Sequence, residues 1–192
     1  TLFGQPARVV SNPNPGFPLD LTAFDNAGLK VSIDQGGALT ESTLNIPTKT
    51  YADRVELIGE LNSQISVNGS LKNKILFRTN ALGEVVLRTV EGGEQISIKI
   101  DNADPAINIA AELGFAADAQ QIGTRAANTD LINDLANVGS DLTDGDIIRF
   151  TGAKPNGERF DGRFTFDTDT SDTVQALFSI VENTYGGVQA GL

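Results

Sequence analysis

The chain has 192 residues, an excess of 25 acidic over 14 basic residues, and no Cys, His or Met. Without Cys or His it cannot form a thiol nucleophile, a Ser-His-Asp triad or a zinc site with those ligands. The net charge of −11 repels nucleic acid and anionic lipid. No stretch reaches the roughly 18 apolar residues of a membrane-spanning helix. We therefore expect neither nucleic acid nor membrane as a partner.

Residues 1–37 are expected to form a proline-rich loop followed by a β-hairpin. Three of the seven prolines fall between Pro13 and Pro18, where each fixes φ and favours an extended residue before it. Apolar residues alternate with polar ones around Leu19 and again around Val31, on either side of the segment 25–28, which contains Asn and Gly. This pattern predicts a hairpin that turns at residues 25–28.

Residues 38–120 are predicted to form a first α+β module that contains one long helix. Thr50 precedes Asp53 by three residues, which is the spacing of a helix start. The apolar residues that follow recur at spacings of 3, 3 and 4, as one buried face of a helix requires. That face consists of Val55, Ile58, Leu61 and Ile65.

The rest of the first module is predicted to contain three antiparallel strands and a second helix. Alternating apolar residues mark strands within 75–77, 85–87 and 96–100, separated by glycine-containing turns. The segment from Asn102 to Pro105 offers a capping side chain and a proline suited to the first helical position. We expect a helix of about three turns that ends at Gly114, where glycine allows a left-handed stop.

Residues 121–192 are predicted to contain an acidic linker and a second hairpin-plus-helix module. From Asp101 to Asp146 there are nine acidic residues and one basic residue. Residues 116–145 have only sparse apolar positions, notably Leu131, Leu135 and Val138, so at most one short helix is expected in the linker. A hairpin should follow, turning at residues 154–157. Residues 170–172 should cap a final helix that ends at Gly186-Gly187 and covers Phe160, Phe164 and Phe166.

The predicted fold class is therefore α+β, with two modules in which β-hairpins and small antiparallel sheets each pack with an amphipathic helix. The remaining glycine pairs, Gly36-Gly37 and Gly92-Gly93, lack the spacing of phosphate-binding loops and are interpreted as turns.

Two acidic clusters are the candidate chemical sites. The segment 141–146 has spaced carboxylates beside a glycine, but its spacing departs from an EF-hand loop and Glu158 is too distant to complete it. We expect a structural turn there, with a cation site as the alternative. Asp167 and Asp169 could act as a glycosidase pair, but together with Asp172 they are better explained as a solvated strand end leading to a helix cap. No catalytic, cofactor-binding or metal-binding residue is assigned.

The acidic linker also raises the question of what faces it. The strand region before it contains five basic residues: Lys72, Lys74, Arg78, Arg88 and Lys99. The linker is either a solvated face or a surface that docks on these basic residues in a neighbour such as another copy, in which case reversing Asp130 and Asp134 should weaken assembly.

The second module contains the sequences DGDIIRFTGAKPNG (144–157), FTF (164–166), TVQAL (173–177) and YGG (185–187). In this order they resemble the pattern of bacterial flagellar hook proteins. In the first module, GEVVL (83–87), GEQISIKI (93–100) and AAELGF (110–115) are similar to segments of hook, hook-associated and filament proteins.

This resemblance implies a structural, non-enzymatic subunit that is exported and assembles into the flexible tubular joint of the flagellum. The implied partners are copies of itself and neighbouring axial proteins, with no cofactor, and the implied location is extracellular or periplasmic. Hook subunits begin and end with long helices that are not present here, and the chain begins with Thr1. We therefore expect a fragment from the outer part of the subunit.

Two other functions fit the composition. An adhesin or phage-tail module that binds glycan or protein would share the acidic, strand-rich character. A glycoside hydrolase would use the carboxylates of Asp167 and Asp169.

Overall fold

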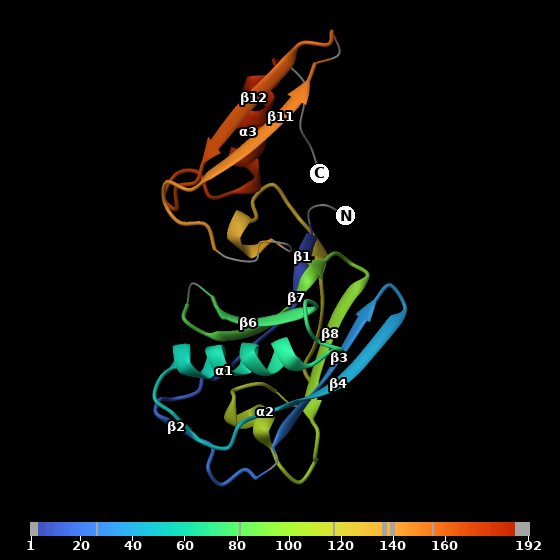
Figure 1. The fold of residues 1–192 in the computed structure, drawn as a ribbon, viewed down its shortest axis with the longest axis vertical. Helices are drawn as coiled ribbons and strands as arrows, with labels where there is room; N and C mark the ends of the chain where they lie inside the picture. The colour runs from blue at the N-terminus through green and yellow to red at the C-terminus, as the bar shows by residue number, and fades with distance from the viewer. Residues whose placement is uncertain are drawn as a thin grey trace.

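The computed structural model describes residues 4–25, 27–80, 82–116, 118–135, 138, 141–154 and 156–186. These residues form twelve strands in four small antiparallel sheets, three α-helices and one short 3-10 helix. The α+β prediction is confirmed. The first module lies at one end of the molecule and the second, drawn in orange and red, at the other (Figure 1).

Two four-stranded sheets build the first module. One has the order β10-β1-β7-β6 and the other β4-β3-β8-β9, while a two-residue ladder joins β2 to β5. The first sheet comprises β1 (Gly4–Val10), β6 (Ile75–Thr79), β7 (Val85–Gly92) and β10 (Thr124–Arg125). The second comprises β3 (Gly28–Gln35), β4 (Ala38–Asn45), β8 (Ile96–Asn102) and β9 (Gln120–Ile122). The ladder comprises β2 (Leu19–Asp20) and β5 (Thr50–Tyr51).

The hairpin lies one strand later than the sequence predicts. β2 pairs with β5, and β3 pairs with β4 in a register that places Gln35 opposite Ala38. The two residues between them, Gly36 and Gly37, both have positive φ, +68° and +93°. A two-residue hairpin loop needs positive φ at both positions, which glycine adopts without strain. The glycine pair therefore makes the turn, while residues 25 and 27 belong to the connection between β2 and β3, and Gly28 already begins β3.

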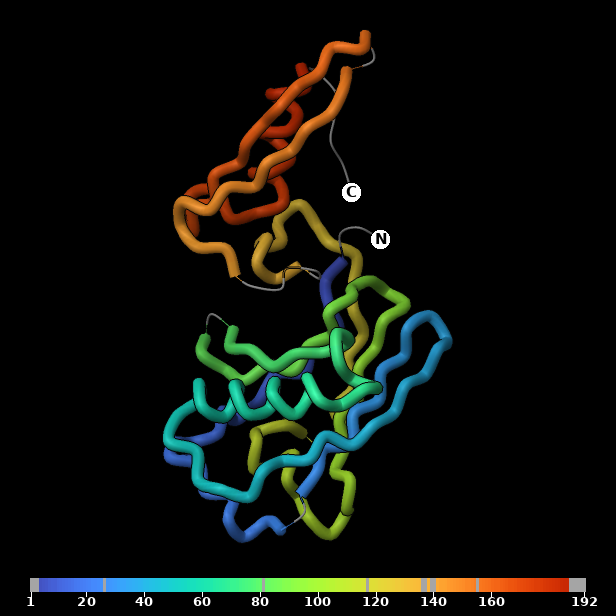
Figure 2. The backbone as a smooth tube through the Cα atoms, in the orientation of Figure 1, coloured from blue at the N-terminus to red at the C-terminus, as the bar shows by residue number. Residues whose placement is uncertain are grey.

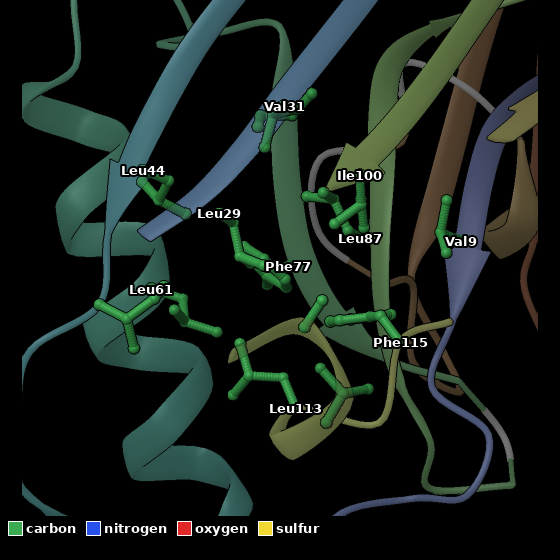
Figure 3. Packing of buried hydrophobic residues seen from close by; sticks show 14 of the residues in the cluster. Val9, Leu29, Val31, Leu44, Leu61, Phe77, Leu87, Ile100, Leu113 and Phe115 are labelled. Carbon is green, nitrogen blue, oxygen red and sulfur yellow. The ribbon is translucent and has the colours of Figure 1, made fainter. Parts of the chain in front are cut away.

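The predicted boundary between residues 37 and 38 falls within one sheet. β3 and β4 lie on either side of it and pair along their whole length. The main cluster of buried apolar residues also runs from Ala7 to Phe115. Residues 1–37 and 38–120 thus share a single core. Side chains from both sheets, the long helix and the loop after α2 meet in it (Figure 3).

Helix α1 (Arg54–Val67) begins later than predicted. Asp53 is its N-cap and accepts a hydrogen bond from the backbone N of Glu56 at 2.9 Å, whereas Thr50 lies in β5. The buried face consists of Leu57, Leu61 and Ile65. Val55, which was expected in the core, is 81% exposed. The buried face repeats every four residues from Leu57, and Val55 does not lie on it.

The remaining elements of the first module were only partly predicted. β6 and β7 pair as expected, but β8 pairs with β3 and β9 in the other sheet. Helix α2 (Ile109–Glu112) has a single turn and begins four residues after Pro105. Its N-cap is Asn108, whose side chain makes no capping bond, although Asn102 Oδ1 accepts from the backbone N of Ala110 at 2.9 Å. Gly114 has the predicted left-handed conformation, with a φ of +80°.

The second module has the predicted architecture. β11 (Ile147–Ala153) and β12 (Arg159–Thr165) pair along seven residues, and α3 (Val174–Tyr185) covers one face. The predicted turn lies between them, although Pro155 is outside the described residues. Thr173, and none of residues 170–172, caps α3 through its hydroxyl. Gly186 ends the helix with a φ of +77°, while Gly187 lies outside the described residues.

Aromatic packing holds the helix on the hairpin as expected. Phe164 and Phe166 are buried in a cluster that includes Leu177 of α3. Phe160 meets the ring of Tyr185 edge-on, with centroids 4.9 Å apart. Such aromatic contacts add to the apolar burial that fixes a helix on a two-stranded sheet.

Candidate functional site

The segment between the modules is more structured than a linker. Its first part supplies β9 and β10 to the sheets of the first module, and it contains the predicted short helix as the 3-10 turn η1 (Ile132–Asp134). Figure 2 shows the chain crossing once from the lower body to the upper one through this segment.

After β10 the segment belongs to the second module. The backbone N of Ile132 donates to the carbonyl of Asp172 at 2.7 Å, and the N of Val174 donates to the carbonyl of Asp130 at 3.0 Å. Ala126 and Leu135 share a buried cluster with Val174 and Phe178 of α3. Residues 126–135 therefore form a base for α3, and this base faces the first module.

We call the contact between this base and the sheet of β1, β6 and β7 the joint. A cleft of about 580 Å³ runs along it. Its polar lining includes Arg8, Arg78, Arg88, Asp134 and Asp141.

Arg88 of β7 is the centre of the joint. Its side chain is only 3% exposed, and its Nη2 donates to the carbonyl of Leu135 at 3.1 Å and of Val138 at 3.0 Å. Burial, helped by the nearby charge of Arg78, lowers its pKa to about 10, so Arg88 stays charged at neutral pH. A buried guanidinium from one module thus donates to two backbone carbonyls that follow the base of the other.

Two further arginines surround Arg88. Arg8 on β1 lies directly opposite it in the ladder, and like charges in that position repel. Asp134 offsets this repulsion, because its carboxylate lies 3.8 Å from the guanidinium of Arg8. Arg78 forms an ion pair with Asp141 and donates to the carbonyl of Asn133. The joint is therefore held by two ion pairs between arginine and aspartate and by hydrogen bonds from arginines to backbone carbonyls.

The acidic segment and the basic strands meet within one chain. In addition to the pairs at the joint, Lys99 pairs with Asp118 at 2.7 Å. Lys74 donates to the hydroxyl of Thr40, whereas Lys72 has no ion pair within the described ranges. The charge complementarity noted in the sequence is therefore largely used inside the molecule. Asp130 caps the backbone N of Ala127 at 2.6 Å.

The carboxylates of the loop 141–146 make local contacts. Asp144 accepts from the backbone N of Thr168 at 2.8 Å, and Asp146 accepts from the backbone N of Thr143 at 2.7 Å. Glu158 pairs with Lys154 at 3.2 Å at the tip of the hairpin. Among the described residues no group of three acidic side chains is placed to hold a metal ion. These contacts agree with the structural turn that the sequence predicts.

Asp167 also makes the contacts of a turn. It accepts from the backbone N of Asp169 at 2.9 Å, and this bond together with Thr170 lowers the pKa of its carboxyl. A glycosidase acid needs a raised pKa to hold its proton at neutral pH. The lowered pKa instead keeps the Asp167 carboxyl ionised, as the acceptor of this turn.

One charged surface escaped the sequence analysis. The face of the β11–β12 hairpin that points away from α3 carries Arg149, Arg159 and Arg163, all exposed. We call it the arginine face. Its signal in the sequence is the alternation at period two of these arginines with phenylalanines that are partly or fully buried. The register of the hairpin shows that the three arginines share one face.

No helix in the described ranges is long and apolar enough to cross a membrane. No protein-family model, curated protein or solved structure matches the chain.

Proposed function

We propose that the chain is the outer part of a structural subunit of the bacterial flagellar hook. In this proposal it acts outside the cell or in the periplasm, without catalysis, and contacts copies of itself and neighbouring axial proteins. The sequence resemblance in segments 144–157 and 173–177 supports it. The observation that carries it is the polar joint between two modules that have separate cores.

The three clusters of buried apolar residues each stay within one module. The contact between the modules depends instead on Arg88 and on the pairs of Arg8 with Asp134 and of Arg78 with Asp141. Polar interfaces of modest size permit relative domain motion, because their contacts can be replaced by water and formed again. A hook subunit must allow such motion, since its neighbours shift at each turn of the motor.

A gene deletion tests this proposal in the full-length protein. Cells that lack the gene should lose both hooks, seen by electron microscopy, and motility, and the wild-type gene should restore both. Complementation with Arg88→Met should restore hooks with altered curvature, while Lys72→Met, which removes one exposed positive charge outside the joint, should behave as wild type. Normal hooks in the deletion strain would refute the proposal. A strong hit on a glycan array from the purified chain would then favour the adhesin.

A further inference from the structure

The arginine face is an unpartnered, positively charged surface on an acidic protein. Arg149, Arg159 and Arg163 share it with Asp161, which gives a net charge of +2 on a chain of net charge −11. Within the described ranges none of the three guanidiniums forms an ion pair or a side-chain hydrogen bond. Ile147 on the same face is 49% exposed.

The arrangement of these charges costs stability within the hairpin. Arg149 lies directly opposite Arg163, and like charges in such a cross-strand pair destabilise the sheet. An acidic residue at either position would remove the repulsion. Local conflicts of this kind concentrate where a surface serves a function other than folding.

Exposed carboxylates lie at the opposite end of the molecule. Asp25 lies between β2 and β3, Asp104 lies between β8 and α2, and Glu112 ends α2. All three are exposed, and none forms an ion pair within the described part of the chain. The two loops and α2 lie in the lower part of Figure 1, and the hairpin lies at the upper end. We call these three residues the acidic end.

We propose that the arginine face docks on the acidic end of a second copy of the chain, so that copies associate head to tail. The arginine face carries a net charge of +2 and the acidic end a net charge of −3, and the two surfaces lie at opposite ends of one elongated molecule. A contact between two different surfaces leaves a free one at each end of the pair, which is the geometry that builds open rows or helices. The inference deepens the proposed function, because it names one contact of the assembly.

Cross-linking tests which surfaces meet, since the chain has no cysteine of its own. Thr151→Cys places a thiol on the arginine face, and Ala106→Cys places one beside Asp104. Mixed under mild oxidation, these two variants should form a disulfide-linked pair at least about tenfold faster than Thr151→Cys mixed with Val55→Cys. Val55 is highly exposed but lies on α1, away from both surfaces. Equal rates for the two mixtures would overturn the proposal.

Charge reversal tests the electrostatic basis of the contact. Arg149→Glu/Arg163→Glu should slow the Thr151–Ala106 cross-link about tenfold or more, and Asp25→Lys/Glu112→Lys in the other copy should restore it. The matched control, Lys72→Glu/Arg125→Glu, changes the net charge equally at exposed sites off the face and should have a small effect. Circular dichroism confirms that each variant is folded, and the single variant Arg149→Thr replaces the double one if it is not. If the variants are folded and the rate of cross-linking is not restored, the pairing of the arginine face with the acidic end is contradicted.

Salt and a polyanion complete the test. From about 0.01 M to about 1 M salt the Debye length falls from about 30 Å to about 3 Å, so cross-linking should slow in parallel. Heparin that binds through Arg149 and Arg163 while copies fail to cross-link would assign the face to a polyanion and overturn the proposal. If cross-linking succeeds but the deletion strain keeps its hooks, the contact stands and the hook function fails. If full-length Arg149→Glu/Arg163→Glu builds normal hooks, the hook function stands and this contact fails.

Discussion

Replacing Arg88 with methionine should release the second module from the first. Methionine keeps most of the length and apolar packing of the side chain but removes the donors to the carbonyls of Leu135 and Val138. A hydrogen bond from a charged group contributes about 1.5–3 kcal/mol. Two such bonds at the lower value give about 3 kcal/mol, which raises the ratio of open to closed joint by about 100-fold.

Two effects oppose this loss, so the net change in free energy lies toward the lower end of the range. Arg88 loses solvation when it is buried, and it faces Arg8 across the ladder. Removing its charge relieves both costs. In Arg88→Met the backbone carbonyl of Leu135 nevertheless stays buried and loses its donor. A buried carbonyl without a hydrogen bond costs about 1–3 kcal/mol.

Energy transfer between two dyes can follow the joint, because introduced cysteines are the only thiols in the chain. With dyes at Val55→Cys in the first module and Thr151→Cys in the second, Arg88→Met should broaden the distance distribution. Lys72→Met, which also removes one positive charge, should leave it unchanged. Salt screens the half-exposed pair of Arg8 and Asp134, so salt alone should open the parent less than the substitution does. Identical distributions for Arg88→Met and the parent would refute the role of Arg88.

Three further changes test the fold. Gly114→Ala should lower the free energy of unfolding by about 2 kcal/mol or more in urea, because alanine at its φ of +80° is strained and the added methyl would overlap the carbonyl O of Pro13 in the loop after β1; parent-like stability would contradict this. Gly162→Ala should cost about 1–3 kcal/mol, since its methyl would overlap the ring of Phe150, and an unchanged unfolding curve would count against that packing. Burial raises the pKa of Tyr51 to about 12, while an unfolded tyrosine titrates near 10. The folded state thus keeps its proton longer, so stability should fall as the pH rises from about 10 to 12. In Tyr185→Phe, Tyr51 is the only tyrosine. The absorbance of its phenolate should appear near pH 12, and titration near pH 10 would contradict the burial of Tyr51.

The second module was predictable from sequence because its contacts are local. β11 and β12 are joined by a short turn, and α3 follows with a threonine cap and a glycine stop. Each of these signals depends on residues a few positions apart. The one error, the position of the cap, moved the helix start by a single residue from Asp172 to Thr173.

The first module was less predictable because its strands pair over long distances. β1 pairs with β7, about 80 residues later, and β3 with β8, about 70 residues later. Alternating apolar residues identify such strands but do not identify their partners. β9 and β10 are short strands in which every residue is exposed. They therefore lack the alternation of apolar and polar residues by which a strand is identified in a sequence. The sequence predicts a turn at the glycine pair 36–37, but the alternation around residues 25–28 favours a hairpin there instead, and the register of β3 and β4 places the hairpin turn at the glycines.

The sequence gives the amount and the sign of charge in each segment, but it does not show which charged residues contact one another. The sequence shows an acidic segment next to basic strands, but whether they meet in one chain or between two depends on a register that only the fold supplies. Once β1 and β7 place Arg8 opposite Arg88, Asp134 is needed inside the molecule to offset that repulsion. The arginines of β11 and β12 share their face with Asp161, but none of them forms an ion pair within the described part of the chain. The unmatched positive charge therefore lies on the hairpin, and a contact between copies should be sought there before it is sought at the linker.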